Sequence, residues 1–176
     1  WNIDKPILVH AEEDVIDLVI KICALTKKRT HICHVSSREE LEKIISVKKK
    51  GLNITCGVTP HHLFLTEEDV KRFKSYGIMK PPVYDGFSDF AFKNLKHIDL
   101  IESDHAPHTK EEKDSDNPPF GVPNLETTLG LLLTATEKGL LTVEEIKRLC
   151  HDAPAQIFGI KQDAQIEVDE NEGWTV

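Results

Sequence analysis

Short apolar runs alternate with amphipathic stretches along the first third of the chain. The apolar runs occupy residues 6–10, 30–35 and 53–58, and their lengths are typical of buried strands. The stretches between them place apolar residues at helical spacing: Val15, Leu18, Val19 and Ile22 in the first, and Leu41, Ile44 and Ile45 in the second. The pattern predicts the element order β-α-β-α-β.

Capping boxes mark the starts of two predicted helices. In this motif a serine or threonine lies three residues before a glutamate, and each side chain caps the other residue's backbone N–H. The candidates are Ser36 with Glu39, Ser37 with Glu40, and Thr142 with Glu145. The last of these predicts a helix over residues 143–150.

The predicted strands recur at a regular pitch. His10 and His34 are 24 residues apart, and Val58 follows His34 by another 24. Such a pitch suits βα units that feed a parallel sheet, but it does not separate a closed barrel from an open sheet. Polar residues at the ends of successive strands favour the barrel, because (β/α)₈ barrels carry their chemistry at the carboxyl ends of the strands.

The second half of the chain is less regular. Residues 77–86 contain two adjacent prolines and predict a loop, since proline continues neither a helix nor a central strand. Residues 98–103 predict the next strand, and 110–123 predict a long polar loop of a kind that is often functional. A strongly apolar helix is expected over 125–136.

This count gives about four strands suited to a parallel barrel, where a full barrel has eight. The predicted fold is α/β, as roughly the second half of a TIM-type (β/α)₈ barrel over residues 1–160. Residues 165–168 alternate like a strand. Residues 161–176 are therefore expected to begin a C-terminal β segment.

The composition narrows the function classes. The formal net charge is −8 and the only basic cluster is 48–50, so no nucleic-acid surface is expected. No apolar run could span a membrane, and four scattered cysteines without a secretory signal indicate a reduced, cytoplasmic protein. Cys33 and Cys56 fall inside predicted strands, where a buried apolar role is the default. Because the chain begins at Trp1 and its single methionine is Met79, we expect a processed product or an internal piece of a longer chain.

Three groups at the ends of predicted strands are candidate metal ligands: His10, His34 and Asp104. Neutral imidazole and carboxylate suit Zn²⁺ and related ions. A single strand-end histidine is more often a hydrogen-bonded structural residue, and His31 is interpreted as a surface or structural residue. The occurrence of three donors at equivalent ends of successive units favours a metal site.

Four motifs resemble those of dihydroorotases, which belong to the amidohydrolase superfamily of metal-dependent (β/α)₈ barrels. In chain order they are VHAE at 9–12, HICHV at 31–35, TPHHLFL at 59–65 and SDHAPHT at 103–109. The resemblance covers essentially the whole chain. It is strongest to the type that also occurs as a domain of the animal multifunctional pyrimidine-synthesis protein.

The resemblance implies two Zn²⁺ ions in an intact active site. His10 and His34 look like the histidines that bind the more buried metal. Asp104 looks like the aspartate that ligates the other metal and acts as general base toward a metal-bound hydroxide. Animal-type enzymes carry a glutamate where this chain has Gly57, which weakens the case for an additional metal there.

The resemblance also implies contacts with the substrate. His108 is similar to the histidine that contacts the substrate carboxylate, and Lys80 falls where some family members carry a residue that faces the substrate. The backbone around Gly121 and Pro123 is expected to hydrogen-bond the ring amide. His62 is expected to support the metal centre.

The implied reaction is the reversible hydrolysis of the cyclic amide of dihydroorotate to N-carbamoyl-L-aspartate in UMP biosynthesis. The family's His-x-His pair and bridging lysine are absent from these residues, so the isolated chain is expected to be nearly inactive. Two alternatives stay open: a related cyclic amidase, such as a hydantoinase or allantoinase, and a non-catalytic dihydroorotase-like partner of aspartate transcarbamoylase. Association with that transcarbamoylase and a homodimer are the expected protein contacts.

Overall fold

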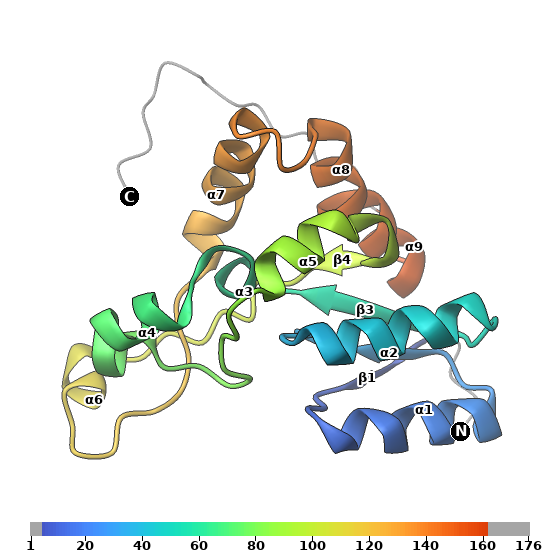
Figure 1. Ribbon diagram of the computed structural model, residues 1–176, viewed down its shortest axis with the longest axis horizontal. Coiled ribbons are helices and arrows are strands. Elements are labelled where there is room, and N and C mark those ends of the chain that lie inside the picture. The colour runs from blue at the N-terminus through green and yellow to red at the C-terminus, as the bar shows by residue number, and fades with distance from the viewer. Residues whose placement is uncertain (1–4, 162–176) are drawn as a thin grey trace.

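The computed structural model describes residues 5–161, and its centre is a parallel sheet flanked by helices (Figure 1). The four strands are β1 (Ile7–Val9), β2 (Thr30–Ile32), β3 (Ile54–Val58) and β4 (Leu100–Ile101). In the register, Ile7 lies opposite Thr30, which lies opposite Ile54. All four predicted strands are present, but each is shorter than its apolar run. The segment 165–168 lies outside the described residues.

The strand order identifies the architecture that the pitch left open. All pairings are parallel, and the strands lie side by side in chain order, β1-β2-β3-β4. In a doubly wound open sheet the order reverses at a switch point, and no reversal occurs among these four strands. Right-handed crossovers that always step in one direction place their helices on one face of the sheet. The fold is therefore part of a (β/α) barrel, as predicted.

The helices divide into crossover helices and an excursion. Those linking the first strands are α1 (Asp14–Thr26) and α2 (Arg38–Lys49). Between β3 and β4 lie α3 (Pro60–Phe64), α4 (Glu67–Phe73), the 3₁₀ helix η1 (Lys74–Gly77), α5 (Phe87–Lys93) and the 3₁₀ helix η2 (Leu95–His97). After β4 come α6 (Lys110–Lys113), α7 (Leu125–Glu137), α8 (Val143–Lys147), the π-helix η3 (Arg148–Asp152) and α9 (Ala153–Phe158). The predicted helix 143–150 is thus α8 continued by a π-helix.

A pair of small elements lies at the end of the sheet toward which the strands point. Figure 1 shows α4 and α6 next to each other at the lower left, beyond the arrowhead of β3. The buried Lys113 ammonium of α6 donates to the carbonyl oxygens of Ser75 (3.2 Å) and Pro119 (2.9 Å). This bond ties the loop after β4 to the excursion after β3.

The start of α2 confirms one of two alternative caps. Ser37 and Glu40 form the capping box. The alternative with Ser36 and Glu39 is wrong, because the N-cap residue of α2 is Ser37. The backbone N–H of Ser36 instead donates to the Glu40 carboxylate at 3.2 Å. The predicted apolar face of α2 is confirmed: Leu41, Ile44 and Ile45 are all buried. The box of Thr142 and Glu145 is also present.

Helix α1 is present where the helical spacing predicted it, but the sheet covers a different set of its apolar residues. The buried residues of α1 are Ile16, Val19 and Cys23. Of the residues that marked the helix in the sequence, Val15, Leu18 and Ile22 are each about half exposed. Both faces of α1 are apolar, and spacing alone cannot say which of two apolar faces meets the sheet. Among residues 5–161, no helix is long and apolar enough to cross a membrane.

Candidate active site

The first two predicted metal ligands meet at the carboxyl ends of β1 and β2. His10 Nδ1 lies 2.8 Å from His34 Nε2, and the two ring centroids are 4.5 Å apart in an edge-to-face arrangement. Parallel neighbouring strands place their carboxyl ends at one edge of the sheet, so residues 24 positions apart become neighbours. The sequence-based pairing of His10 with His34 agrees with this geometry.

The hydrogen bonds of this pair leave one imidazole nitrogen without a partner. His10 Nε2 lies 2.9 Å from the Glu12 carboxylate, which accepts, so this nitrogen is the donor. With neutral rings, His10 Nδ1 then accepts from His34 Nε2–H, and the lone pair of His34 remains on Nδ1. That Nδ1 is buried and has no hydrogen-bond partner within the described part of the chain. Because buried polar atoms are almost always paired, an unpaired imidazole lone pair fits a metal ligand. Both ring nitrogens of His10 have partners, so His10 would bind a metal only by giving up its hydrogen bond to His34 or to Glu12.

The backbone at two predicted ligands is strained. His34 has φ +39° and Asp104 has φ +44°, a region that residues other than glycine rarely adopt. Such conformations cost of order 1–3 kcal/mol and cluster at functional sites. His34 is held in place by its backbone N–H, which donates to the Glu102 carboxylate at 3.0 Å. Both turns re-aim the chain directly after a strand ends.

The third predicted ligand, Asp104, is half-buried just after β4. Its carboxylate does not form one compact group with His10 and His34. Within residues 5–161, the group of at least three donor atoms that all lie within 4.8 Å of one another consists of His31, Cys33 and Glu102. The role of Asp104 as ligand and base stays a prediction.

His62 supports the loop after α3 through both of its ring nitrogens. Its Nε2–H donates to the carbonyl of Pro81 at 3.0 Å, and its Nδ1 accepts from the Thr59 hydroxyl at 2.7 Å. Burial lowers the pKa of His62 to about 4, so the ring is neutral at pH 7. Because both nitrogens are occupied by the protein, this geometry suits the supporting role predicted from the resemblance. It also fixes the backbone next to Lys80.

The neighbouring His61, to which the sequence analysis gave no role, is a further candidate for the site. Its Nδ1 accepts from the Asn124 side-chain amide at 2.7 Å, and its Nε2 is buried without a partner in the described residues. Burial, with His62 and His34 nearby, lowers the pKa of His61 to about 3. Asn124 also donates to the Ser103 carbonyl at 2.8 Å, so Asn124 joins the motif at 59–65 to the motif at 103–109. The sequence could not separate the roles of the two adjacent histidines, because their hydrogen-bond partners lie far away along the chain.

The loop after β4 brings His108 and Gly121 together. His108 Nε2 donates to the Phe120 carbonyl at 3.0 Å. Gly121 has φ +131°, and a Cβ there would lie 2.6 Å from the Ala106 carbonyl oxygen and 3.3 Å from His108 Nε2. Only glycine allows this close approach. His105, which had no role in the sequence analysis, accepts the backbone N–H of Asn124 at 3.1 Å.

The two remaining predicted substrate contacts are Lys80 and Pro123. Lys80 is largely exposed, and its ammonium is 4.0 Å from the Glu12 carboxylate. Pro123 lines a cleft of about 280 Å³ together with His61 and Asn124. No substrate contact follows from these positions alone, so both assignments stay predictions.

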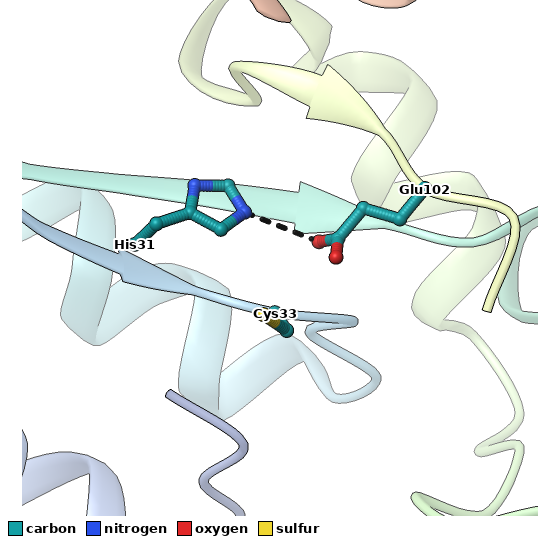
Figure 2. Close-up of side chains that lie close together, drawn as sticks. All are labelled: His31, Cys33 and Glu102. Atoms are coloured by element: carbon teal, nitrogen blue, oxygen red, sulfur yellow. Dashed lines mark hydrogen bonds and ion pairs between the residues drawn. The ribbon is translucent and has the colours of Figure 1, made fainter. Parts of the chain in front are cut away.

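A further polar cluster lies beside the histidine pair, on β2 and on the residues that directly follow β2 and β4 (Figure 2). It contains His31, which is 1% exposed and therefore structural rather than on the surface, and Glu102, whose Oε1 is 3.3 Å from His31 Nε2. The interpretation of Cys33 as an apolar strand residue is wrong: it follows the end of β2, is half-buried, and lies against Glu102. Burial, and then the nearby carboxylate, raise the pKa of the Cys33 thiol to about 12. Cys56, by contrast, is fully buried as predicted.

Comparison with known proteins gives the ancestry of the chain. The chain is 39% identical over 180 residues to the multifunctional protein CAD of Squalus acanthias, covering 100% of this chain and 8% of that protein. It is 40% identical over 158 residues to the dihydroorotase of Pyrococcus horikoshii, covering 85% of this chain and 37% of the enzyme. The chain is a relative of the dihydroorotases. No family model matches it.

Solved structures support the same fold. L-hydantoinase from Arthrobacter aurescens matches this chain with a TM-score of 0.79 and 28% sequence identity. The match covers 83% of this chain and 34% of the hydantoinase chain. The inactive dihydroorotase-like domain of a CAD-like protein from Chaetomium thermophilum matches 99% of this chain with a TM-score of 0.74. That match is 23% identical and covers 52% of the domain, so it supports the fold alone. The chain thus spans only part of each of these relatives.

Proposed function

We propose that the intact protein carrying this chain is a zinc-dependent dihydroorotase. It would interconvert dihydroorotate and N-carbamoyl-L-aspartate in pyrimidine synthesis. The observation that carries the proposal is the buried, unpaired Nδ1 of His34. The His34 ring contacts His10, and both histidines lie just beyond the carboxyl ends of their strands, as Asp104 does after β4. The imidazole and carboxylate donors suit zinc, which when bound lowers the pKa of water and polarises an amide carbonyl.

The chain's own residues would bind the substrate and move its protons. Asp104 would take a proton from the attacking water and return it to the leaving amide nitrogen, as base and then acid. His108 and Lys80 would bind the substrate carboxylate through charge-assisted hydrogen bonds. The backbone at Gly121 and Pro123 would contact the ring amide, and the missing side chain at Gly121 leaves room for this approach.

The test is a substrate panel on the intact protein. We expect turnover of dihydroorotate, with hydantoin and allantoin poor substrates. Asp104→Asn should lower kcat/KM by 10²- to 10⁴-fold or more, the usual contribution of a general base. Asp116→Asn, at an exposed position of the same loop, is the matched control and should change little. Preferred turnover of hydantoin would favour the related cyclic amidase, which the hydantoinase match also supports.

Metal content separates the enzyme from a non-catalytic partner. About two metal ions per chain in the intact protein would favour the enzyme. No bound metal and no turnover would favour the dihydroorotase-like scaffold that associates with aspartate transcarbamoylase. The isolated 176-residue chain is expected to show little or no activity in the same assay, and robust turnover by it would contradict that expectation. A cytoplasmic location and a homodimer remain predictions.

A further inference from the structure

Lys113 is a buried lysine at the end of α6 whose ammonium is bound by backbone carbonyls. The residue is 4% exposed, and its Nζ donates to the carbonyl oxygens of Ser75 at 3.2 Å and Pro119 at 2.9 Å. Burial of a charged group is costly and is tolerated where its protons are hydrogen-bonded. The two carbonyls therefore fix the end of the Lys113 side chain, and that side chain in turn fixes the two backbone segments.

One of the two carbonyls belongs to the segment that leads to Lys80, a predicted contact with the substrate carboxylate. Ser75 lies in η1, five residues before Lys80. The same segment meets the loop after β4 at a second point, where the backbone N–H of Gly121 donates to the Ile78 carbonyl at 3.0 Å. The Lys113 bond and this backbone bond together hold the chain before Lys80 against the loop after β4.

The other carbonyl is adjacent to the one that holds His108, the second predicted contact with the substrate carboxylate. The carbonyl of Pro119 accepts from Lys113, and the carbonyl of the next residue, Phe120, accepts the Nε2–H of His108 at 3.0 Å. Because a carbonyl can only accept, this bond fixes the orientation of the His108 ring and the nitrogen that carries its proton. Movement of the segment 119–120 would therefore release the ring.

We propose that Lys113 is a positioning residue that sets the spacing between Lys80 and His108. It acts through the backbone on both sides and does not contact the substrate. A carboxylate held by two charge-assisted hydrogen bonds needs both donors in place, because such bonds depend on distance and direction. This inference rests on the proposed function, since Lys80 and His108 are substrate contacts only within it.

The first test is amide hydrogen–deuterium exchange of the intact protein, which reports the link between the loops without any turnover. Lys113→Met keeps the apolar stem and removes the ammonium. We expect faster exchange in peptides that contain the Gly121 amide, because its hydrogen bond to Ile78 joins the same two segments. Lys110→Met removes an exposed lysine of the same helix and should leave the exchange unchanged. Equal exchange in Lys113→Met and the wild type would overturn the proposal.

The second test separates positioning from a purely structural role by steady-state kinetics with dihydroorotate. A lysine needed only for folding would lower the active fraction, and hence kcat, at constant KM. A positioning lysine should instead raise KM by ~10-fold or more in Lys113→Met, the effect of one misplaced hydrogen bond to a charged group, with kcat little changed. Lys113→Gln keeps N–H donors on a side chain one atom shorter, and its KM should fall between the two. A lower kcat at unchanged KM in both variants would overturn the proposal.

A double-mutant cycle shows whether Lys113 acts through His108. His108→Ala should raise KM by itself, because it removes a direct contact with the substrate. In that background Lys113→Met should have a smaller effect on KM than in the wild type, since the ring that it positions is gone. Effects on KM that multiply in full would show that the two residues act independently, and would refute the route through His108.

The two proposals can fail separately. A wild-type protein that does not turn over dihydroorotate, but whose Gly121 amide exchanges faster in Lys113→Met, would refute the dihydroorotase proposal and support Lys113 as the link between the loops. An active wild type whose exchange and KM are both unchanged by Lys113→Met would do the reverse.

Discussion

Replacement of Glu40 tests the hydrogen bonds that hold the loop after β1 against α2. The carboxylate is 4% exposed and accepts three backbone N–H groups: Oε1 takes that of Glu13 at 2.8 Å, and Oε2 takes those of Ser36 at 3.2 Å and Ser37 at 3.1 Å. Glu13 has φ +50°, so the carboxylate also fixes a strained turn three residues after His10. One side chain thus secures both the cap of α2 and the loop that carries the first predicted ligand.

The expected cost follows from the groups left unpaired. Glu40→Ala removes the acceptor of all three donors, and each buried donor without a partner costs about 1–3 kcal/mol. Water can reach the exposed Glu13 and the half-buried Ser37, so we expect a total loss of about 3–5 kcal/mol, below the sum for three fully buried donors. Glu40→Gln keeps one oxygen and the shape of the side chain, and should cost about 2–3 kcal/mol. Against a typical stability of about 5–15 kcal/mol, the alanine variant loses a large part of the whole.

The assay is urea unfolding followed by far-ultraviolet circular dichroism, with the free energy of unfolding extrapolated to water. Glu39→Ala is the matched control, because the neighbouring carboxylate is exposed and should contribute only a few tenths of a kcal/mol through the helix dipole. If Glu40→Ala were no more destabilising than Glu39→Ala, the account of these three hydrogen bonds would be refuted.

Two other predictions concern pH and the loop after β4. The pKa values of His61 and His62 are lowered from 6.5 to about 3 and about 4, so below pH 6.5 the unfolded state binds more protons. The free energy of unfolding should be highest above pH 6.5 and fall toward pH 4, and His62 alone should account for about 3 kcal/mol of that fall. Urea unfolding midpoints between pH 7 and pH 4 measure the change, and midpoints that do not vary with pH would contradict the prediction. Gly121→Ala should raise KM for dihydroorotate at least tenfold, because its Cβ would lie 2.6 Å from the Ala106 carbonyl oxygen. Gly139→Ala, also at positive φ but with nothing within 4 Å, should cost about 1 kcal/mol of stability and leave KM unchanged.

Much of the fold was predictable because the signals are local. Apolar runs located all four strands, and capping motifs located the starts of α2 and α8, since these depend on residues within one turn of each other. Helix α1 shows the limit of such signals. This helix is apolar on both faces. It buries Ile16 and Cys23 rather than Val15 and Ile22, because packing against the sheet determines which face is covered.

The candidate site divides in the same way. Residues that end successive strands could be predicted to meet, because parallel strands bring their carboxyl ends to one edge, and His10 and His34 do so. The spacing could not show that His61 would be buried with an unpaired nitrogen. Which nitrogen of a histidine is free depends on hydrogen bonds to partners distant in the sequence, such as Asn124.

The sequence by itself determined the order of strands and helices along the chain, the pairing of His10 with His34, and the similarity to dihydroorotases. Only the tertiary structure decided what happens at Gly57. From the sequence, this glycine indicated a lost carboxylate. In the folded chain the missing side chain leaves a space on β3, and Glu102 of the segment after β4 fills it and meets His31 and Cys33. The reason is physical: residues 45 positions apart compete for one volume, and that competition exists only after the strands have paired.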